Sequence, residues 1–120
     1  MKDLVTNVIV RLEVEGLHNW PAAREVFPEV SFLSDPHRHM FHITLKKRVY
    51  HDDRDIEFLL FKRDVLAYLK ERYYLDIQRI HDFGSKSCEM IAKELFNEFH
   101  CEYVSVFEDG ENGAEVYLGD

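Results

Sequence analysis

Three histidines occupy positions at which two extended segments can bring them together. His37 and His39 are two residues apart in a segment typical of a β-strand, so their side chains point to the same side. His18 lies four residues past Val14, and its parity matches the apolar face of the preceding strand. If these two strands pair in antiparallel fashion, the end of the first lies beside the start of the second. His18 then stands next to the other two histidines.

Three neutral imidazoles that converge at a strand end, with no obvious fourth protein ligand, are typical of a catalytic zinc site with one open position. Zinc held in this way acidifies a bound hydroxyl or water and polarises carbonyl groups. The alternative is that the histidines are half-buried packing residues, each satisfied by backbone carbonyls. Three further histidines are expected at the surface, His42 on the opposite strand face and His51 and His100 at element ends.

Glu108 is a second residue whose position is unusual for its type. It shares a strand face with Val104 and Val106, and carboxylates are rarely buried unless they are paired. A glutamate at the edge of a pocket can accept two N–H hydrogen bonds from the edge of a guanine-like ring. The alternative is an acid at a strand end that turns toward water.

The hydrophobic pattern predicts four strands and two helices that position these residues. Residues 5–15 alternate between apolar and polar with period two, as in a half-buried strand. The helical segments repeat apolar residues at three- and four-residue steps, and Asp55 and Ser87 are the expected N-caps. The expected elements are strands at 5–15, 37–51, 101–108 and 114–118, helices at 56–73 and 88–99, a loop at 19–36, a connecting segment at 74–86 and a hairpin turn at 109–113.

The order β-β-α-α-β-β separates strands from helices and therefore predicts an α+β fold. We expect one domain over residues 1–120, built as a four-stranded antiparallel sheet with two helices on one face. Such a sheet leaves two open edges, which favours pairing with other subunits.

The composition of the chain excludes several classes of function. With 15 basic and 23 acidic residues among 120, the net charge is −8, which argues against non-specific nucleic-acid binding. Apolar runs such as residues 58–61 are far too short to span a membrane, and the first residues do not resemble a secretion signal. Two cysteines do not make a disulfide framework. We therefore expect a cytoplasmic protein without nucleic-acid or membrane partners.

The chain resembles the 6-pyruvoyl-tetrahydropterin synthase and 6-carboxy-tetrahydropterin synthase family. Five segments carry the resemblance, in the family's order and over nearly the whole chain. Each is weak alone, but the five in order are specific for the fold. They are residues 14–18 with His18, residues 37–41 with His37 and His39, residues 57–62, residues 86–92, and residues 108–109 followed by 114–116.

The resemblance implies the tunnelling fold and a set of roles for named residues. It implies that His18, His37 and His39 hold zinc, that Glu108 anchors the pterin ring, and that Ser87 and Cys88 line the same pocket. It also implies trimers stacked into hexamers, in which sheets close into barrels and the pockets lie between subunits.

The chain departs from the family at the residues that move protons. Family enzymes place a catalytic cysteine shortly before the histidine pair, whereas residues 31–36 contain none. A variant branch uses a carboxylate in that loop, for which Glu29 and Asp35 are the candidates. Asp76 and His81 are the candidates for the family's Asp-His relay, although their spacing differs from the family pattern.

Three functions follow from these observations. The first is a zinc-dependent lyase that acts on 7,8-dihydroneopterin triphosphate, eliminating triphosphate and rearranging or cleaving the side chain. The second is a protein on the same scaffold that binds a pterin, purine or nucleotide without turning it over. The third is a structural or interaction module in which the histidines only pack.

Overall fold

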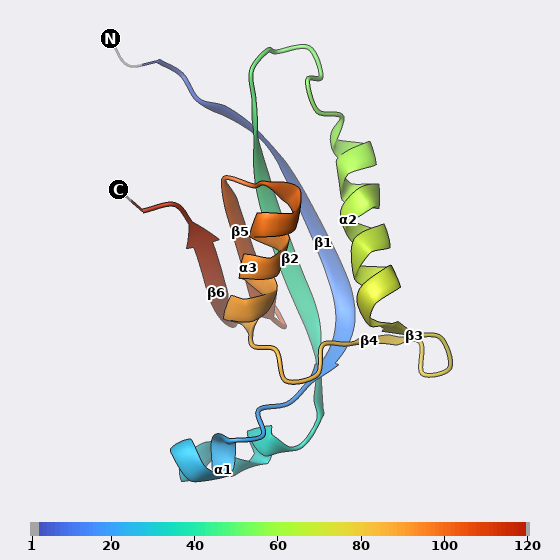
Figure 1. The fold of residues 1–120 in the computed structure, drawn as a ribbon, viewed down its shortest axis with the longest axis vertical. Coiled ribbons are helices and arrows are strands. Elements are labelled where there is room, and N and C mark those ends of the chain that lie inside the picture. The colour runs from blue at the N-terminus through green and yellow to red at the C-terminus, as the bar shows by residue number, and fades with distance from the viewer. Residues whose placement is uncertain (1–2, 120) are drawn as a thin grey trace.

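The centre of the molecule is a pair of long antiparallel strands, β1 (Thr6–His18) and β2 (His37–Val49), seen in a computed structural model that describes residues 3–119 (Figure 1). Their register runs without interruption from Thr6 opposite Val49 to His18 opposite His37. Burial alternates along β1, with Val10, Leu12 and Val14 facing the core. The predicted parity of His18 is therefore confirmed, and no bulge intervenes at Gly16.

The sheet has six strands rather than the predicted four, and it is mixed rather than antiparallel. The strand order is β3-β4-β1-β2-β5-β6, with β4 parallel to β1 and all other neighbours antiparallel. The added strands lie within the predicted connecting segment and are too short to produce a detectable period. The remaining bounds are β3 (Tyr74–Leu75), β4 (Ile80–Asp82), β5 (Tyr103–Glu108) and β6 (Asn112–Tyr117).

The predicted loop between the first two strands contains short helical turns, α1 (Ala23–Val26) and the 3-10 segment η1 (Pro28–Ser34), which lie at the far end of the molecule from both termini (Figure 1). Two backbone hydrogen bonds fix this segment. Trp20 N–H donates to Leu33 O over 2.7 Å, and Asn19 N–H donates to Gly84 O over 2.9 Å. The second bond ties the end of β1 to the segment that precedes the third helix.

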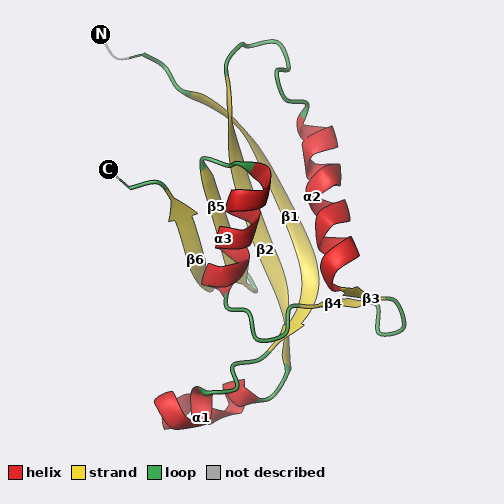
Figure 2. Cartoon of the chain, in the orientation of Figure 1, coloured by secondary structure: helices red, strands yellow, loops and turns green. Residues whose placement is uncertain are grey.

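Two helices, α2 (Phe58–Tyr73) and α3 (Cys88–Phe99), lie side by side on one face of the sheet, as predicted (Figure 2). The core lies between them and β1, β2 and β5, and its largest fully buried side chains include Phe41, Leu69 and Leu95. Within residues 3–119, no helix is both long and apolar enough to cross a membrane.

Of the two predicted N-cap residues, one is correct and one is wrong. Ser87 caps α3 as predicted, since its hydroxyl accepts from Met90 N–H over 3.2 Å. The cap of α2 is Glu57 rather than Asp55: the Glu57 carboxylate accepts from Leu60 N–H over 2.9 Å. Asp55 instead accepts from Tyr50 N–H, which closes the loop after β2.

A half-buried carboxylate joins the two helices to the segment before α3. Glu94 on α3 accepts from the hydroxyls of Tyr68 and Tyr73 on α2 and from the ammonium of Lys86. Lys86 also donates to the Tyr73 hydroxyl over 2.6 Å. Burial alone would raise the pKa of Glu94, but these hydrogen bonds outweigh burial and lower it.

Glu94→Gln is expected to lower the free energy of unfolding at pH 7 by roughly 1.5–3 kcal/mol, because it removes an ionised acceptor from three donors. A carboxyl whose pKa is depressed in the folded state stabilises the fold above its unfolded pKa, and this effect is lost as the pH falls through the folded value. The difference between wild type and variant should therefore shrink in acid. Urea unfolding at pH 7 and at an acidic pH measures this difference in stability. Glu98→Gln, at an exposed position on the same helix, is the control. Equal stability of the two variants would refute the assignment.

Candidate functional site

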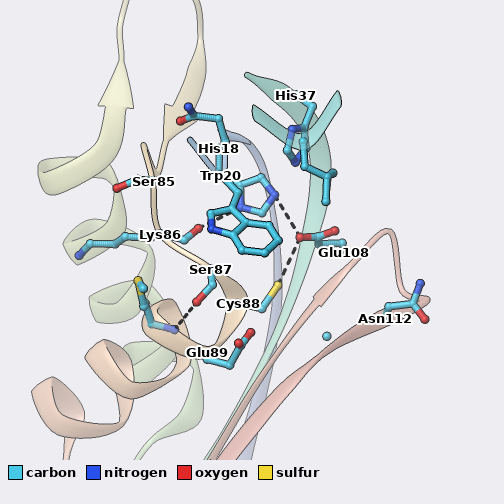
Figure 3. Close-up of a pocket in the computed structure, with 14 residues that line it drawn as sticks. His18, Trp20, His37, Ser85, Lys86, Ser87, Cys88, Glu89, Glu108 and Asn112 are labelled. Carbon is cyan, nitrogen blue, oxygen red and sulfur yellow. Dashed lines mark hydrogen bonds and ion pairs between the residues drawn. The ribbon is translucent and has the colours of Figure 1, made fainter. Parts of the chain in front are cut away.

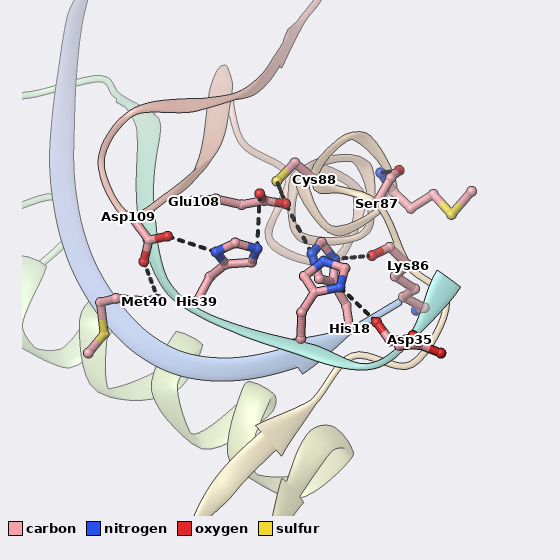
Figure 4. A network of polar contacts seen from close by, with 11 residues as sticks. His18, Asp35, His39, Met40, Lys86, Ser87, Cys88, Glu108 and Asp109 are labelled. Carbon is pink, nitrogen blue, oxygen red and sulfur yellow. Dashed lines mark hydrogen bonds and ion pairs between the residues drawn. The ribbon is translucent and has the colours of Figure 1, made fainter. Parts of the chain in front are cut away.

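The three predicted histidines lie together where β1 ends and β2 begins. Figure 4 shows two of them, His18 and His39. His18 pairs with His37 across the sheet, and His39 pairs with Gly16. The ring centroids of His18 and His37 are 4.5 Å apart, and those of His37 and His39 are 5.1 Å apart. One ring nitrogen from each histidine lies within 4.8 Å of the other two.

Each of the three rings is oriented by an oxygen acceptor at Nδ1. Because carbonyl and carboxylate oxygens only accept, these contacts place a proton on Nδ1, so the neutral form of each ring has its lone pair on Nε2. When a histidine binds a metal through one ring nitrogen, its other ring nitrogen usually donates to an acceptor of this kind. The contacts are His18 to Lys86 O at 3.0 Å, His37 to Asp35 O at 2.9 Å, and His39 to the Asp109 carboxylate at 2.7 Å.

The Nε2 atoms of His18 and His39 are buried and have no hydrogen-bond partner. They lie 3.0 and 3.3 Å from the two carboxylate oxygens of Glu108, which is ion-pair distance, but neither contact has hydrogen-bond geometry. Buried polar atoms are seldom left without a partner in folded proteins. The two atoms therefore indicate a site that is completed by something other than the residues around them.

The electrostatics of the site favour a cation. Burial would lower the pKa of His18, but the Glu108 carboxylate and the Lys86 carbonyl outweigh burial and raise it. Contact with the His18 ring lowers the pKa of Glu108 against the opposing effect of burial. The Met40 N–H and the His39 ring likewise hold the pKa of Asp109 low. Two ionised carboxylates thus border three imidazoles.

These residues fit zinc. Three Nε2 lone pairs on converging imidazoles, each with its Nδ1 fixed by an acceptor, are a donor set typical of this metal. In the neutral rings of His18 and His39, the Nε2 atoms that have no hydrogen-bond partner carry the lone pair that a metal requires.

A cavity of about 480 Å³ adjoins the histidines (Figure 3). His18, His37 and Glu108 border it on one side, and its walls include Trp20 and the start of α3 at Ser87 and Cys88. The lining is largely apolar around a few polar groups, which is typical of a small-molecule site.

Cys88 occupies the first position of α3 and contacts Glu108, with Sγ 3.6 Å from the carboxylate. Burial, aided by the charge of Glu108, raises the pKa of the Cys88 thiol to about 12. The thiol is therefore protonated at neutral pH and serves as a hydrogen-bond donor rather than as a nucleophile.

The four residues proposed as proton-transfer groups lie outside the lining of this cavity. Glu29 and Asp35 are exposed, and Asp35 pairs with Arg24 at 3.4 Å while its carbonyl orients His37. Asp76 lies in the turn between β3 and β4. His81, on β4, packs beside Tyr74 and Phe83, and burial lowers its pKa.

Two residues that orient the histidines were not predicted from the sequence. Asp109 follows Glu108 directly, and its carboxylate bonds both the His39 ring and Met40 N–H. The register that sets Phe41 opposite Glu108 places Asp109 next to these groups, so correct strand pairing was the missing signal. Lys86 contributes a carbonyl, for which the side chain gives no signal.

No protein-family model and no curated protein sequence matches the chain. Several solved structures match its fold, among them the following two. A 6-pyruvoyl tetrahydropterin synthase from Caenorhabditis elegans superimposes with a TM-score of 0.71 and 12% identity, covering 99% of each chain. An uncharacterized protein from Wolinella succinogenes superimposes with a TM-score of 0.58 and 13% identity, covering 98% of this chain and 100% of the other. The chain therefore has the fold of 6-pyruvoyl tetrahydropterin synthase.

Proposed function

We propose that this protein is a zinc-dependent lyase of the pterin synthase type, acting on 7,8-dihydroneopterin triphosphate. The observation that carries the proposal is the convergence of three imidazoles, each fixed through Nδ1, beside a cavity on this fold. A packing role for the histidines does not account for two buried ring nitrogens without partners.

The residues around the cavity would bind the pterin by its ring and its side chain. Zinc on His18, His37 and His39 would lower the pKa of a side-chain hydroxyl and stabilise negative charge on its oxygen. Trp20 offers an apolar surface to the ring, and Ser87 and Cys88 offer polar groups to its edge. Glu108 borders both the cavity and the histidines. A base would accept a proton from the side chain, and triphosphate would leave with the electron pair of the C–O bond that breaks.

A second function, binding of a pterin or purine-like ligand without turnover, is favoured by a specific observation. Among residues 3–119, neither loop carboxylate nor the Asp76–His81 pair lines the cavity. The Cys88 thiol is already protonated at neutral pH because its pKa is raised, so it does not accept a proton. Fold alone does not decide between catalysis and binding.

We further propose that the protein forms trimers stacked into hexamers. The outer strands β3 and β6 leave backbone groups unpaired in the single chain. A neighbouring copy added at these edges would pair them, and it would also bring its own side chains toward the cavity. Sedimentation of the purified protein measures the assembly directly.

Turnover separates the two functions. Zinc-loaded protein incubated with 7,8-dihydroneopterin triphosphate is expected to release triphosphate and a new pterin, which mass spectrometry identifies. Zinc content is measured in the same sample. Stoichiometric zinc with unchanged substrate would overturn the lyase and leave the binding protein, whereas a protein that takes up no zinc would refute the zinc-dependent lyase.

A further inference from the structure

We infer that Glu108 is a fourth protein ligand of the metal in the ligand-free protein, so that the site is closed at rest. The inference rests on the proposed zinc site at His18, His37 and His39. It gives Glu108 a role beyond the ring anchor that the resemblance implies.

The distances around Glu108 match those between ligands of one ion. Its Oε1 lies 3.0 Å from His18 Nε2, and its Oε2 lies 3.3 Å from His39 Nε2. Two atoms that each lie about 2.0–2.1 Å from a zinc ion at the tetrahedral angle are roughly 3.3 Å apart. Neither contact is a hydrogen bond, because both nitrogens lack a partner. Ligands of a shared ion lie beside one another in this way without bonding to each other.

Within residues 3–119, the Glu108 carboxylate faces imidazole rings rather than a permanent cation. Among the described residues, its only ion-pair contacts are with the two histidines, and neither lysine nor arginine reaches it. The groups beside it are imidazole rings, and each ring is held at Nδ1 by an oxygen acceptor. A half-buried anion of this kind is costly, and a dication on the same histidines supplies the missing charge.

The Cys88 thiol holds the carboxylate in this position. It donates to Oε1 over 3.6 Å from the start of α3 (Figure 4). Since Glu108 also borders the cavity, an incoming ligand can displace it from the metal and occupy the vacated position. A closed resting site has a distinct consequence, because it excludes small anions that an open three-histidine site would bind.

Cobalt(II) provides the test, because its visible spectrum reports changes in its ligands. Wild-type protein, Glu108→Gln and Glu108→Asp are loaded with Co²⁺, and affinity is measured by competition with a chromophoric chelator. Azide is then titrated into each sample. Wild type should show no spectral response to azide. Both variants should respond to it, and Glu108→Gln should bind Co²⁺ at least about tenfold more weakly.

Glu111→Gln is the matched control, because Glu111 is exposed in the same turn. It should behave as wild type in both affinity and azide response. Thermal unfolding by circular dichroism verifies that each variant is folded. Equal Co²⁺ affinity and equal azide response in wild type and Glu108→Gln would overturn the fourth ligand while leaving the three-histidine site intact. A wild-type protein that fails to bind Co²⁺ would instead refute the proposed metal site itself, and the fourth ligand with it.

Discussion

Alanine in place of His39 is expected to weaken zinc binding at least about 100-fold, because it removes a proposed ligand rather than a supporting residue. The change leaves the hydrogen bonds of the other two histidines in place. His18 and His37 keep their Nδ1 bonds to backbone carbonyls, while the Asp109 carboxylate loses its ring partner but keeps Met40 N–H. Zinc per protein after dialysis, together with chelator competition, measures the loss.

His42→Ala is the control for this experiment. His42 is the next histidine along β2 but lies on the opposite strand face, where it contacts Glu13 at 3.3 Å. It should bind zinc as tightly as wild type. If His39→Ala or His37→Ala retains stoichiometric zinc, the histidines are packing residues and the metal-dependent functions fail.

Gly113→Ala is expected to lower the free energy of unfolding by about 3 kcal/mol or more. A Cβ atom at this position would lie 2.0 Å from the Val106 carbonyl oxygen and 2.6 Å from the Phe107 Cα. Both atoms belong to the backbone of β5, so no side-chain rotation relieves the clash. Strand β6 must therefore move away from β5, which loosens the packing of Ala114 and Val116 against the core.

Gly119→Ala is the matched comparison, because a Cβ at Gly119 meets no atom within 4 Å. Urea unfolding of both variants measures the effect, and Gly119→Ala should unfold at the wild-type midpoint. Equal urea midpoints for the two variants would refute the predicted clash. Gly113 also borders the cavity, so ligand binding should weaken along with stability in Gly113→Ala.

The histidine cluster was predictable because period-two patterns fix which side of a strand each residue faces. Val10, Leu12 and Val14 set the parity of β1, and an uninterrupted register carries that parity to His18. On β2, His39 and Phe41 share a face for the same reason. Antiparallel pairing then brings the strand ends together.

The rest of the site depends on atoms whose positions side-chain patterns do not encode. Strands β3 and β4 are two and three residues long, which is below the length at which a period is visible. The cap at Glu57 rather than Asp55 depends on where the loop after β2 closes, and this closure involves Tyr50 N–H. The placement of Asp76 and His81 likewise follows from that short hairpin.

The acceptors that orient the three histidines differ in whether an amino-acid substitution removes them. Two are backbone carbonyls, those of Lys86 and Asp35, and a carbonyl persists whatever side chain replaces the residue. Only Asp109 orients its histidine through a side chain. Such a site can keep its hydrogen bonding while most of the surrounding residues are exchanged. Distant members of this fold are therefore better compared by backbone path near the histidines than by residue identity.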